Sequence, residues 1–84
     1  MSTSYILINS DLGTHEAIIG KIKEILDREK NIQYEIQGVY GVYDIILKLS
    51  SDDIDTLRST ITNKIRKITS VQSTLTMMVI EGQE

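Results

Sequence analysis

The sequence contains no cysteine, no proline, no tryptophan and no phenylalanine, and its single histidine is His15. The absence of cysteine excludes disulfides, thiolate metal sites and a cysteine nucleophile. A chain without cysteine and without a signal peptide at its start is typical of the reducing cytoplasm. No apolar run approaches the roughly 18 residues of a membrane span. We therefore expect a cytoplasmic protein that does not engage a membrane.

Positive charge is sparse: nine Lys and Arg stand against twelve Asp and Glu, for a net charge of −3. Nucleic-acid-binding surfaces usually carry a basic patch, so this balance argues against direct nucleic-acid binding. The densest basic run is Lys64–Lys67. We interpret it as the last turn of a helix, where cations complement the helix dipole, with phosphate binding as the alternative.

Reactive groups are also few. His15 falls in the predicted first turn of a helix, where the simplest expectation is an exposed surface residue. No serine lies in a nucleophile-elbow pattern. Asp52, Asp53 and Asp55 do not follow the spacing of a calcium loop, and helix capping explains them better. The sequence thus predicts no catalytic residue, no metal site and no cofactor.

Hydrophobic periodicity predicts the element order β-α-β-β-α-β, which is the ferredoxin-like α+β sandwich. Two helices would then cover one face of a four-stranded antiparallel sheet, in a single domain spanning residues 1–84. The predicted strands are 4–9, 32–40, 43–50 and 71–81, and the predicted helices run from Thr14 to about Asn31 and from Ser50 to about Ser70.

The other face of this sheet would have no cover within the chain. Strand alternation predicts that it carries a mixture of polar and apolar side chains: Gln33, Glu35, Gln37, Val39, Ile46, Lys48, Thr74, Thr76, Met78 and Ile80. An 84-residue chain has only a modest core of its own. A partly apolar face on such a small domain predicts a homodimer formed through the sheets.

The segment 38–49, GVYGVYDIILKL, joins the two central predicted strands. Its simplest interpretation is a hairpin in which Gly41 takes a positive φ and Gly38 marks a bulge or a close approach of another backbone. Tyr40 and Tyr43 would pack at the end of the sheet, and Asp44 would cap its own turn. The alternative is the edge of a small-molecule site.

The segment also resembles a known family. A Gly-x-Tyr-Asp turn before the third strand, here Gly41, Tyr43 and Asp44, and a Thr-x-Thr segment opening the last strand, here 73–76, are similar to the effector-sensing domain of Lrp/AsnC regulators. The resemblance implies a dimeric α/β barrel that assembles further, commonly into octamers, and that binds amino acids or related molecules where dimers meet. Full-length regulators carry a helix-turn-helix domain ahead of the sensing domain. Here the first strand begins by Ser4, so the sequence resembles the stand-alone form, which we expect to act through its own oligomerisation or through a partner such as a full-length regulator.

The resemblance places a ligand at this turn. Backbone N–H groups of 38–42, including Val39, would bind the ligand carboxylate, and Asp44 would bind its ammonium. Tyr40 and Tyr43 would enclose its side chain. We expect Thr74 and Thr76 on the adjacent strand and on the same face as Asp44, where they would add hydroxyls.

Three alternatives remain open at this point. An ACT-like regulatory subunit of a metabolic enzyme has the same element order and also binds amino acids. A small dimeric α/β-barrel enzyme has the same fold, but usually needs a histidine or similar group lining the sheet. A purely structural dimer without a ligand is the third.

Overall fold

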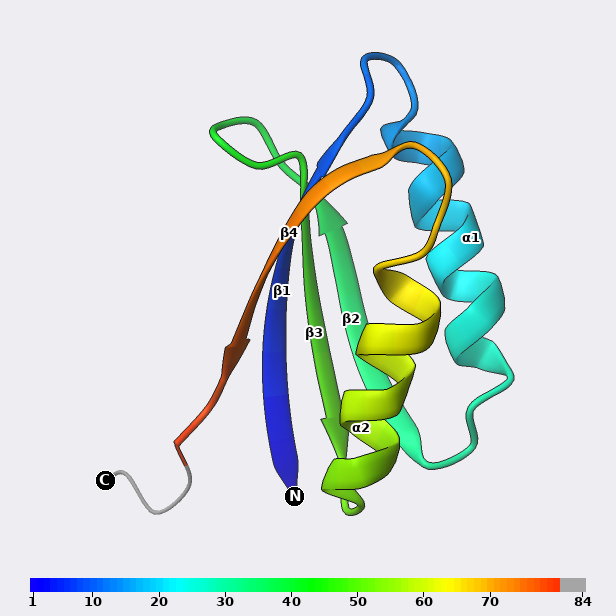
Figure 1. The fold of residues 1–84 in the computed structure, drawn as a ribbon, viewed down its shortest axis with the longest axis vertical. Helices are drawn as coiled ribbons and strands as arrows, with labels where there is room; N and C mark the ends of the chain where they lie inside the picture. The colour runs from blue at the N-terminus through cyan, green and yellow to red at the C-terminus, as the bar shows by residue number, and fades with distance from the viewer. Residues whose placement is uncertain (81–84) are drawn as a thin grey trace.

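The computed structural model describes residues 1–80, and these residues confirm the predicted element order. Figure 1 shows the elements along the chain. They are β1 (Ser2–Ser10), α1 (His15–Asp27), β2 (Ile32–Gly38), β3 (Ile45–Ser51), α2 (Ile54–Thr60), the π-helical segment η1 (Ile61–Ile65) that continues α2, and β4 (Val71–Met78).

The four strands form one antiparallel sheet in the order β2-β3-β1-β4. Both helices lie on the same side of it (Figure 1). This is the predicted ferredoxin-like α+β fold, with the hairpin partners β2 and β3 side by side and β1 between β3 and β4. None of the helices within residues 1–80 has the length and apolar character needed to cross a bilayer.

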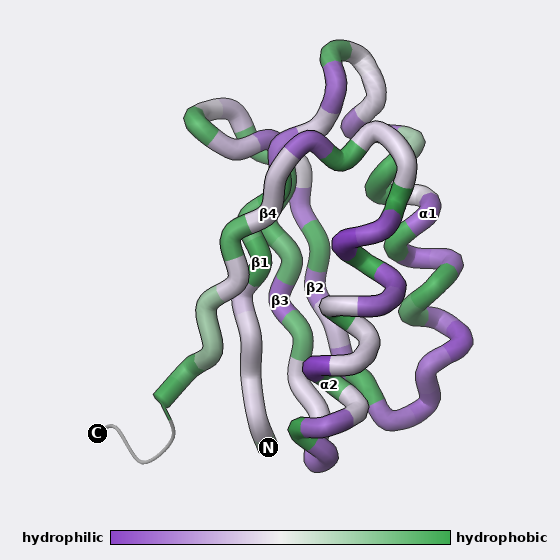
Figure 2. The backbone as a smooth tube through the Cα atoms, in the orientation of Figure 1, coloured by the Kyte–Doolittle hydropathy of each residue, from purple (hydrophilic) through white to green (hydrophobic). Residues whose placement is uncertain are grey.

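The core lies between the helices and the two central strands. Ile6 and Ile8 of β1 are opposite Leu47 and Ile45 of β3, and all four are fully buried. The helices contribute the residues predicted from their periodicity: Ile18, Ile22, Leu26, Leu57, Ile61 and Ile65. Figure 2 shows hydrophilic residues gathered on the outer side of α1. β1, expected to be buried on both faces, is fully buried only on its helix-facing side.

The face assignment of β4 was wrong. Thr74 and Thr76 lie opposite Ile8 and Ile6, and therefore belong to the side of the sheet that carries the helices. Leu75 and Met77 point to the open face instead. The cause is a β-bulge: Ser73 pairs with Asn9, whereas Val71 pairs with Ser10, so one extra residue stands on β4. A one-residue insertion reverses the facing of every side chain beyond it.

The start of α1 also differs from its prediction. Thr14 stands at the N-cap position, but its hydroxyl donates to the carbonyl of Asp11 at 2.6 Å and does not cap the helix. The helix ends at Asp27, a few residues before the predicted end. Beyond the helix, the hydroxyl of Tyr34 donates to Asp27 Oδ1 at 2.7 Å, and this hydrogen bond raises the pKa of Tyr34.

The helix α2 begins at Ile54, later than the predicted start at Ser50, and its N-cap is an acidic residue, Asp53. The Asp53 carboxylate accepts from the N–H groups of Asp55 and Thr56 and from the Thr56 hydroxyl. These hydrogen bonds lower the pKa of Asp53, because they stabilise its charged form. The helix then loosens into η1, where the Arg66 N–H donates to the Ile61 carbonyl, five residues earlier, at 3.0 Å.

The strands are shorter than predicted at three ends. β2 stops at Gly38 and β3 begins at Ile45, so residues 39–44 form a loop rather than a tight turn. β4 ends at Met78, before the predicted end at residue 81. The predicted tail 82–84 lies outside the described residues.

Candidate functional site

A hollow of about 250 Å³ opens where α1 begins and β2 ends, and residues of the predicted site line it. Gly38, Val39, Tyr40 and Asp44 come from the segment 38–44, as expected. The fifth lining residue is His15, the first residue of α1. The sequence interpretation of His15 as an exposed residue is correct, but its place beside Gly38 depends on how α1 packs on β2.

Asp44 is held by backbone and side-chain contacts on both sides. Its N–H donates to the carbonyl of Ile8 at 3.0 Å, and its carbonyl accepts from the N–H of Val39 at 2.8 Å. Its Oδ2 accepts from the Ser10 N–H at 2.9 Å and from the Ser10 hydroxyl at 3.2 Å. The carboxylate thus caps the end of β1, and not its own turn as the hairpin interpretation expected.

The second oxygen of this carboxylate, Oδ1, is not held by such contacts. Among residues 1–80, Asp44 Oδ1 has no hydrogen-bond partner and no cation within ion-pair distance. A half-buried carboxylate fixed through one oxygen and open at the other is suited to accept from a cationic group of a ligand.

The loop beside Asp44 offers backbone donors. The N–H groups of Tyr40, Gly41, Val42 and Tyr43 have no hydrogen-bond acceptor in the part of the chain that the structure describes. The Val39 N–H, which was expected to serve as a ligand donor, is instead occupied by the Asp44 carbonyl. Gly41 has φ +148°, which confirms the predicted positive φ.

Gly38 leaves room in the hollow. A Cβ atom built on it would lie 3.5 Å from Cδ1 of Ile19 and 3.9 Å from Cδ2 of His15. Gly38 pairs regularly with Ile45, so it does not mark a bulge. The Asp44 carbonyl oxygen would lie 4.0 Å away, so all three contacts are ordinary van der Waals contacts and no backbone makes the close approach predicted there. A larger side chain at position 38 would occupy the space between the helix and the loop.

The other predicted site residues lie around this hollow or away from it. Tyr40 is fully exposed and Tyr43 is half-buried, so Tyr40 does not pack at the end of the sheet as the hairpin interpretation predicted. Thr74 and Thr76 were expected to share a face and a strand boundary with Asp44, and this placement is wrong. β1 lies between β3 and β4, and the bulge turns both threonines to the helix side.

Metal sites and histidine–carboxylate pairs each require a particular grouping of side chains. Within residues 1–80, no group of three or more His, Asp or Glu side chains could hold a metal ion. His15 has no hydrogen-bonded carboxylate partner in the same region. The arrangement can bind a small zwitterion, because it offers the Asp44 carboxylate for a cation and the row of loop N–H donors for an anion. The exposed ring of Tyr40 and the half-buried ring of Tyr43 belong to the same loop.

The uncovered sheet face is the second feature of interest. Leu75 and Met77 of β4 are each 44% exposed, and Ile46 of β3 is 37% exposed. Polar neighbours on the same face are partly paired, since Lys48 lies 3.9 Å from Glu35 and its Nζ lies 6.0 Å from the centroid of the Tyr5 ring. The face therefore presents apolar side chains between polar ones, as a protein interface does.

Comparison with known proteins identifies the family to which this fold belongs. The profile of the Lrp/AsnC ligand binding domain matches residues 3–82. The crystal structure of FFRP-DM1 is 34% identical, covers 95% of this chain and 100% of its own, and superposes with a TM-score of 0.76. Hypothetical protein PHS023 from Pyrococcus horikoshii is 35% identical over 95% of this chain and 90% of its own, with a TM-score of 0.74.

A longer relative is AsnC from E. coli, which is 26% identical over 95% of this chain with a TM-score of 0.74. This chain spans about half of it, since the match covers 51% of the AsnC chain. A search of curated proteins found no match. The profile match over nearly the whole sequence and the two relatives above 30% identity show that the chain belongs to the Lrp/AsnC ligand-binding-domain family.

Proposed function

We propose that this chain is a non-enzymatic sensor that binds an amino acid in the hollow between His15 and Asp44. The observation that carries the proposal is the half-used carboxylate of Asp44 next to a loop with free N–H donors. The ligand ammonium would bind Asp44 Oδ1, and its carboxylate would bind N–H groups of the loop 40–43. Tyr40 and His15 would border its side chain.

The sensor would work as an assembly. Two copies would pack through their uncovered sheet faces, burying Leu75, Met77 and Ile46. Burying apolar area of this kind favours association, and the net gain is what remains after the entropy lost when two chains associate. This is the predicted homodimer through the sheets, but its β4 residues would be Leu75 and Met77 in place of the predicted Thr74 and Thr76, because of the bulge in β4.

Assembly beyond the dimer would use one end of the molecule. Leu12 in the β1–α1 loop and Tyr40 and Val42 in the β2–β3 loop are all largely or fully exposed. Figure 1 shows these two loops at the same end, and Figure 2 shows a hydrophobic stretch in each. Contacts between dimers at this end would enclose the hollow, so that the ligand would change the assembly. We propose that the dimers assemble into octamers and that the chain also associates with a full-length Lrp/AsnC regulator.

The experiment is light scattering and thermal unfolding of the purified chain with each of the twenty amino acids. One or a few amino acids are expected to raise the melting temperature and to change the assembly mass, because a ligand that binds only the folded state stabilises it. An assembly whose mass and melting temperature respond to none of the twenty would refute the amino-acid sensor.

A further inference from the structure

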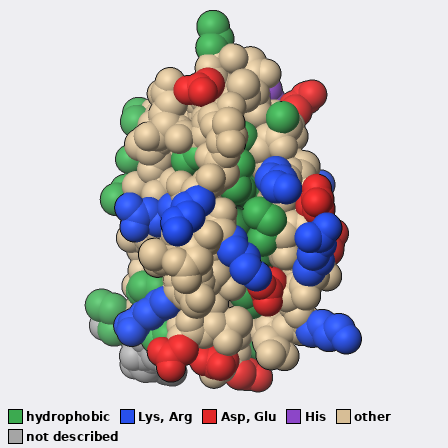
Figure 3. All heavy atoms as spheres, turned by 45° about the vertical axis from the view of Figure 1, so that its right-hand side comes forward, with side chains coloured by type: hydrophobic (Ala, Val, Ile, Leu, Met, Phe, Trp, Pro, Cys, Tyr) green, Lys and Arg blue, Asp and Glu red, His purple; other side chains and the backbone are tan. Residues whose placement is uncertain are grey.

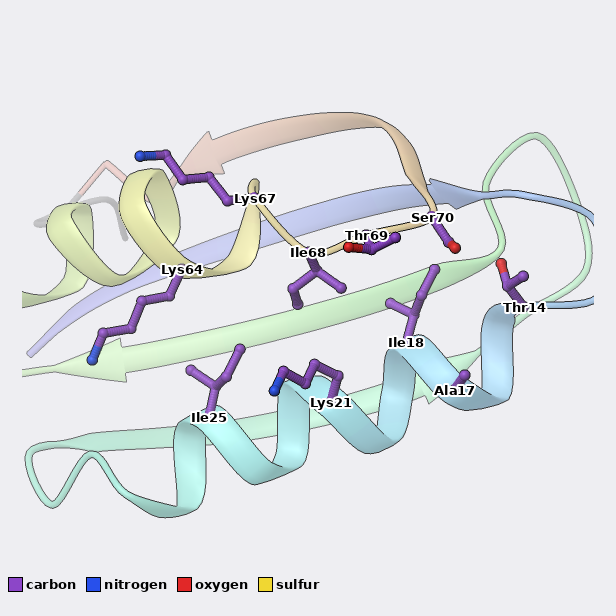
Figure 4. A pocket seen from close by; sticks show the side chains of 10 residues that line it. All are labelled: Thr14, Ala17, Ile18, Lys21, Ile25, Lys64, Lys67, Ile68, Thr69 and Ser70. Carbon is purple, nitrogen blue, oxygen red and sulfur yellow. The ribbon is translucent and has the colours of Figure 1, made fainter.

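A second groove lies on the helical side of the molecule, away from the uncovered sheet face. It runs between α1 and the segment that leads from η1 to β4, and its volume is about 340 Å³. Figure 4 shows the side chains that line it, which come from both segments. This groove shares no lining residue with the hollow at Asp44.

The floor of the groove is apolar. Figure 4 shows Ile18 and Ile25 of α1 pointing toward the segment before β4, and Ile68 of that segment pointing toward α1. Ile18 is buried, but Ile25 and Ile68 are only half-buried, because the two segments do not close over them. A hydrocarbon chain placed between them would bury apolar surface that water covers in the isolated chain.

The rim of the groove is basic. Lys21, Lys64 and Lys67 all border it, in a chain whose net charge is −3. Figure 3 shows hydrophobic surface flanked by Lys and Arg side chains on this side of the molecule. Within residues 1–80, Lys67 makes no ion pair, Lys21 lies 3.8 Å from Glu24 at an exposed site, and Lys64 pairs with Glu29. The rim therefore has positive charge to offer an anion.

Two unusual backbone features border the same groove. Lys64 belongs to the π-helical segment η1, a rare geometry that is frequent at functional sites. Ser70 has φ +77°, although it is not glycine. Residues held in such conformations cost stability and tend to cluster at ligand sites. Ser70 is fixed there because its carbonyl accepts from the Asp11 N–H at 2.9 Å.

We propose that this groove binds a small amphipathic anion, namely an aliphatic carboxylate, with its tail on Ile18, Ile25 and Ile68 and its carboxylate at the rim lysines. Charge complementarity selects an anion, and the apolar floor selects one with a hydrocarbon tail. The volume is near the lower limit of small-molecule pockets, which favours a short tail.

This site does not depend on the proposed amino-acid sensor, but it has a structural link to it. Thr14 lines the groove, and the next residue, His15, lines the hollow at Asp44. A ligand that draws the segment around Ile68 toward α1 would act on the same helix start that borders the amino-acid site. The domain would then respond to two ligands of different chemistry.

The test is titration of the full chain with octanoate, followed by calorimetry and by amide shifts in ¹H–¹⁵N NMR spectra. Octanoate is expected to bind saturably and to shift the amides of Ile18, Ile25 and Ile68. Octan-1-ol has the tail without the charge, and acetate has the charge without the tail. Each is expected to bind at least tenfold more weakly than octanoate.

Two kinds of variant locate the site. The double substitution Lys21→Gln and Lys67→Gln is expected to weaken octanoate at least tenfold. Lys23→Gln with Lys30→Gln removes the same charge outside the groove and is expected to leave the affinity within twofold of wild type. Ala17 is an exposed residue of α1 that lines the groove. Ala17→Phe keeps every lysine but fills the groove, and is expected to abolish binding.

Three results would overturn the proposal. The first is the absence of saturable octanoate binding to the wild-type chain. The second is an equal loss of affinity in the groove variant and in its charge-matched control, which would indicate general attraction to lysines. The third is a set of amide shifts confined to residues 39–44, which would place octanoate in the hollow at Asp44.

Discussion

Asp44 performs two separable tasks, and substitutions can divide them. Its Oδ2 accepts two hydrogen bonds from Ser10, whereas its Oδ1 is free for a ligand. Asp44→Ala removes both bonds and leaves the Ser10 N–H without its partner. At about 1 kcal/mol for each bond, we expect a loss of about 2 kcal/mol in the free energy of unfolding. For a chain of this size, such a loss lowers the melting temperature by roughly 8 to 16 °C.

Asp44→Asn separates the tasks, because the amide oxygen can still accept from Ser10 but carries no charge. We expect its free energy of unfolding to fall by less than about 1 kcal/mol. Its affinity for the amino acid that stabilises the wild type most should fall by about 10- to 100-fold, because a hydrogen bond to a charged group is worth about 1.5–3 kcal/mol. Ser10→Ala is the matched control, since it removes one of the two bonds and leaves the charge in place.

The measurements are thermal unfolding followed by circular dichroism, and calorimetric titration with that amino acid. Ser10→Ala is expected to melt a few degrees lower and to bind with wild-type affinity. Wild-type affinity in Asp44→Asn would refute the role of this carboxylate in binding the ammonium. A wild-type melting temperature in Asp44→Ala would show that the two Ser10 bonds contribute no net stability.

Three further predictions concern the sheet face, the pH dependence and the loop. Leu75→Glu should convert the dimer to monomers in light scattering, because it places a charge on the open face, whereas Thr76→Glu on the other face should not; equal effects would contradict the proposed interface. The hydrogen bond from Tyr34 to Asp27 raises the tyrosine pKa, so its stabilising contribution should be complete below the ordinary tyrosine pKa and lost as the pH rises through the raised value. Asp27→Asn should lower that pKa in an ultraviolet titration, and an unchanged curve would contradict the assignment. Gly41→Ala should lower the free energy of unfolding by about 1–3 kcal/mol, because a φ of +148° strains any residue with a side chain. Nothing within 4 Å obstructs the added Cβ, so the loss would come from backbone strain alone. Denaturant unfolding tests this, and no loss would mean that the loop adjusts freely.

Much of the fold could be predicted because its signals are local. Alternation along 45–49 identified Ile45, Leu47 and Leu49 as the covered face of β3, and the structure confirms it. The helical spacing of Ile18, Ile22 and Leu26 identified the buried stripe of α1. The same reasoning failed for β4, because one bulged residue after Val71 reverses an alternation that is otherwise regular.

The candidate site was predictable only in part, for a related reason. The segment 38–44 carries most of the hollow in consecutive residues, so its pattern was visible in the sequence. His15 was not assigned to it, since an isolated histidine in a first helical turn has no periodic signal that links it to Gly38. The groove with Ile68 and its lysines was equally hidden, because it is formed by two segments some forty or more residues apart in the sequence.

The sequence by itself determined the element order, the helix-facing sides of β2 and β3, and the glycine conformation at Gly41. These follow from side-chain periodicity and backbone sterics, which act between near neighbours in the chain. Only the tertiary structure decided that Asp44 caps β1 through Ser10, that His15 borders the hollow, and that Leu75 rather than Thr76 faces the open side. Each of these depends on strand register and helix packing, which join residues distant in sequence and are chosen by the fold as a whole.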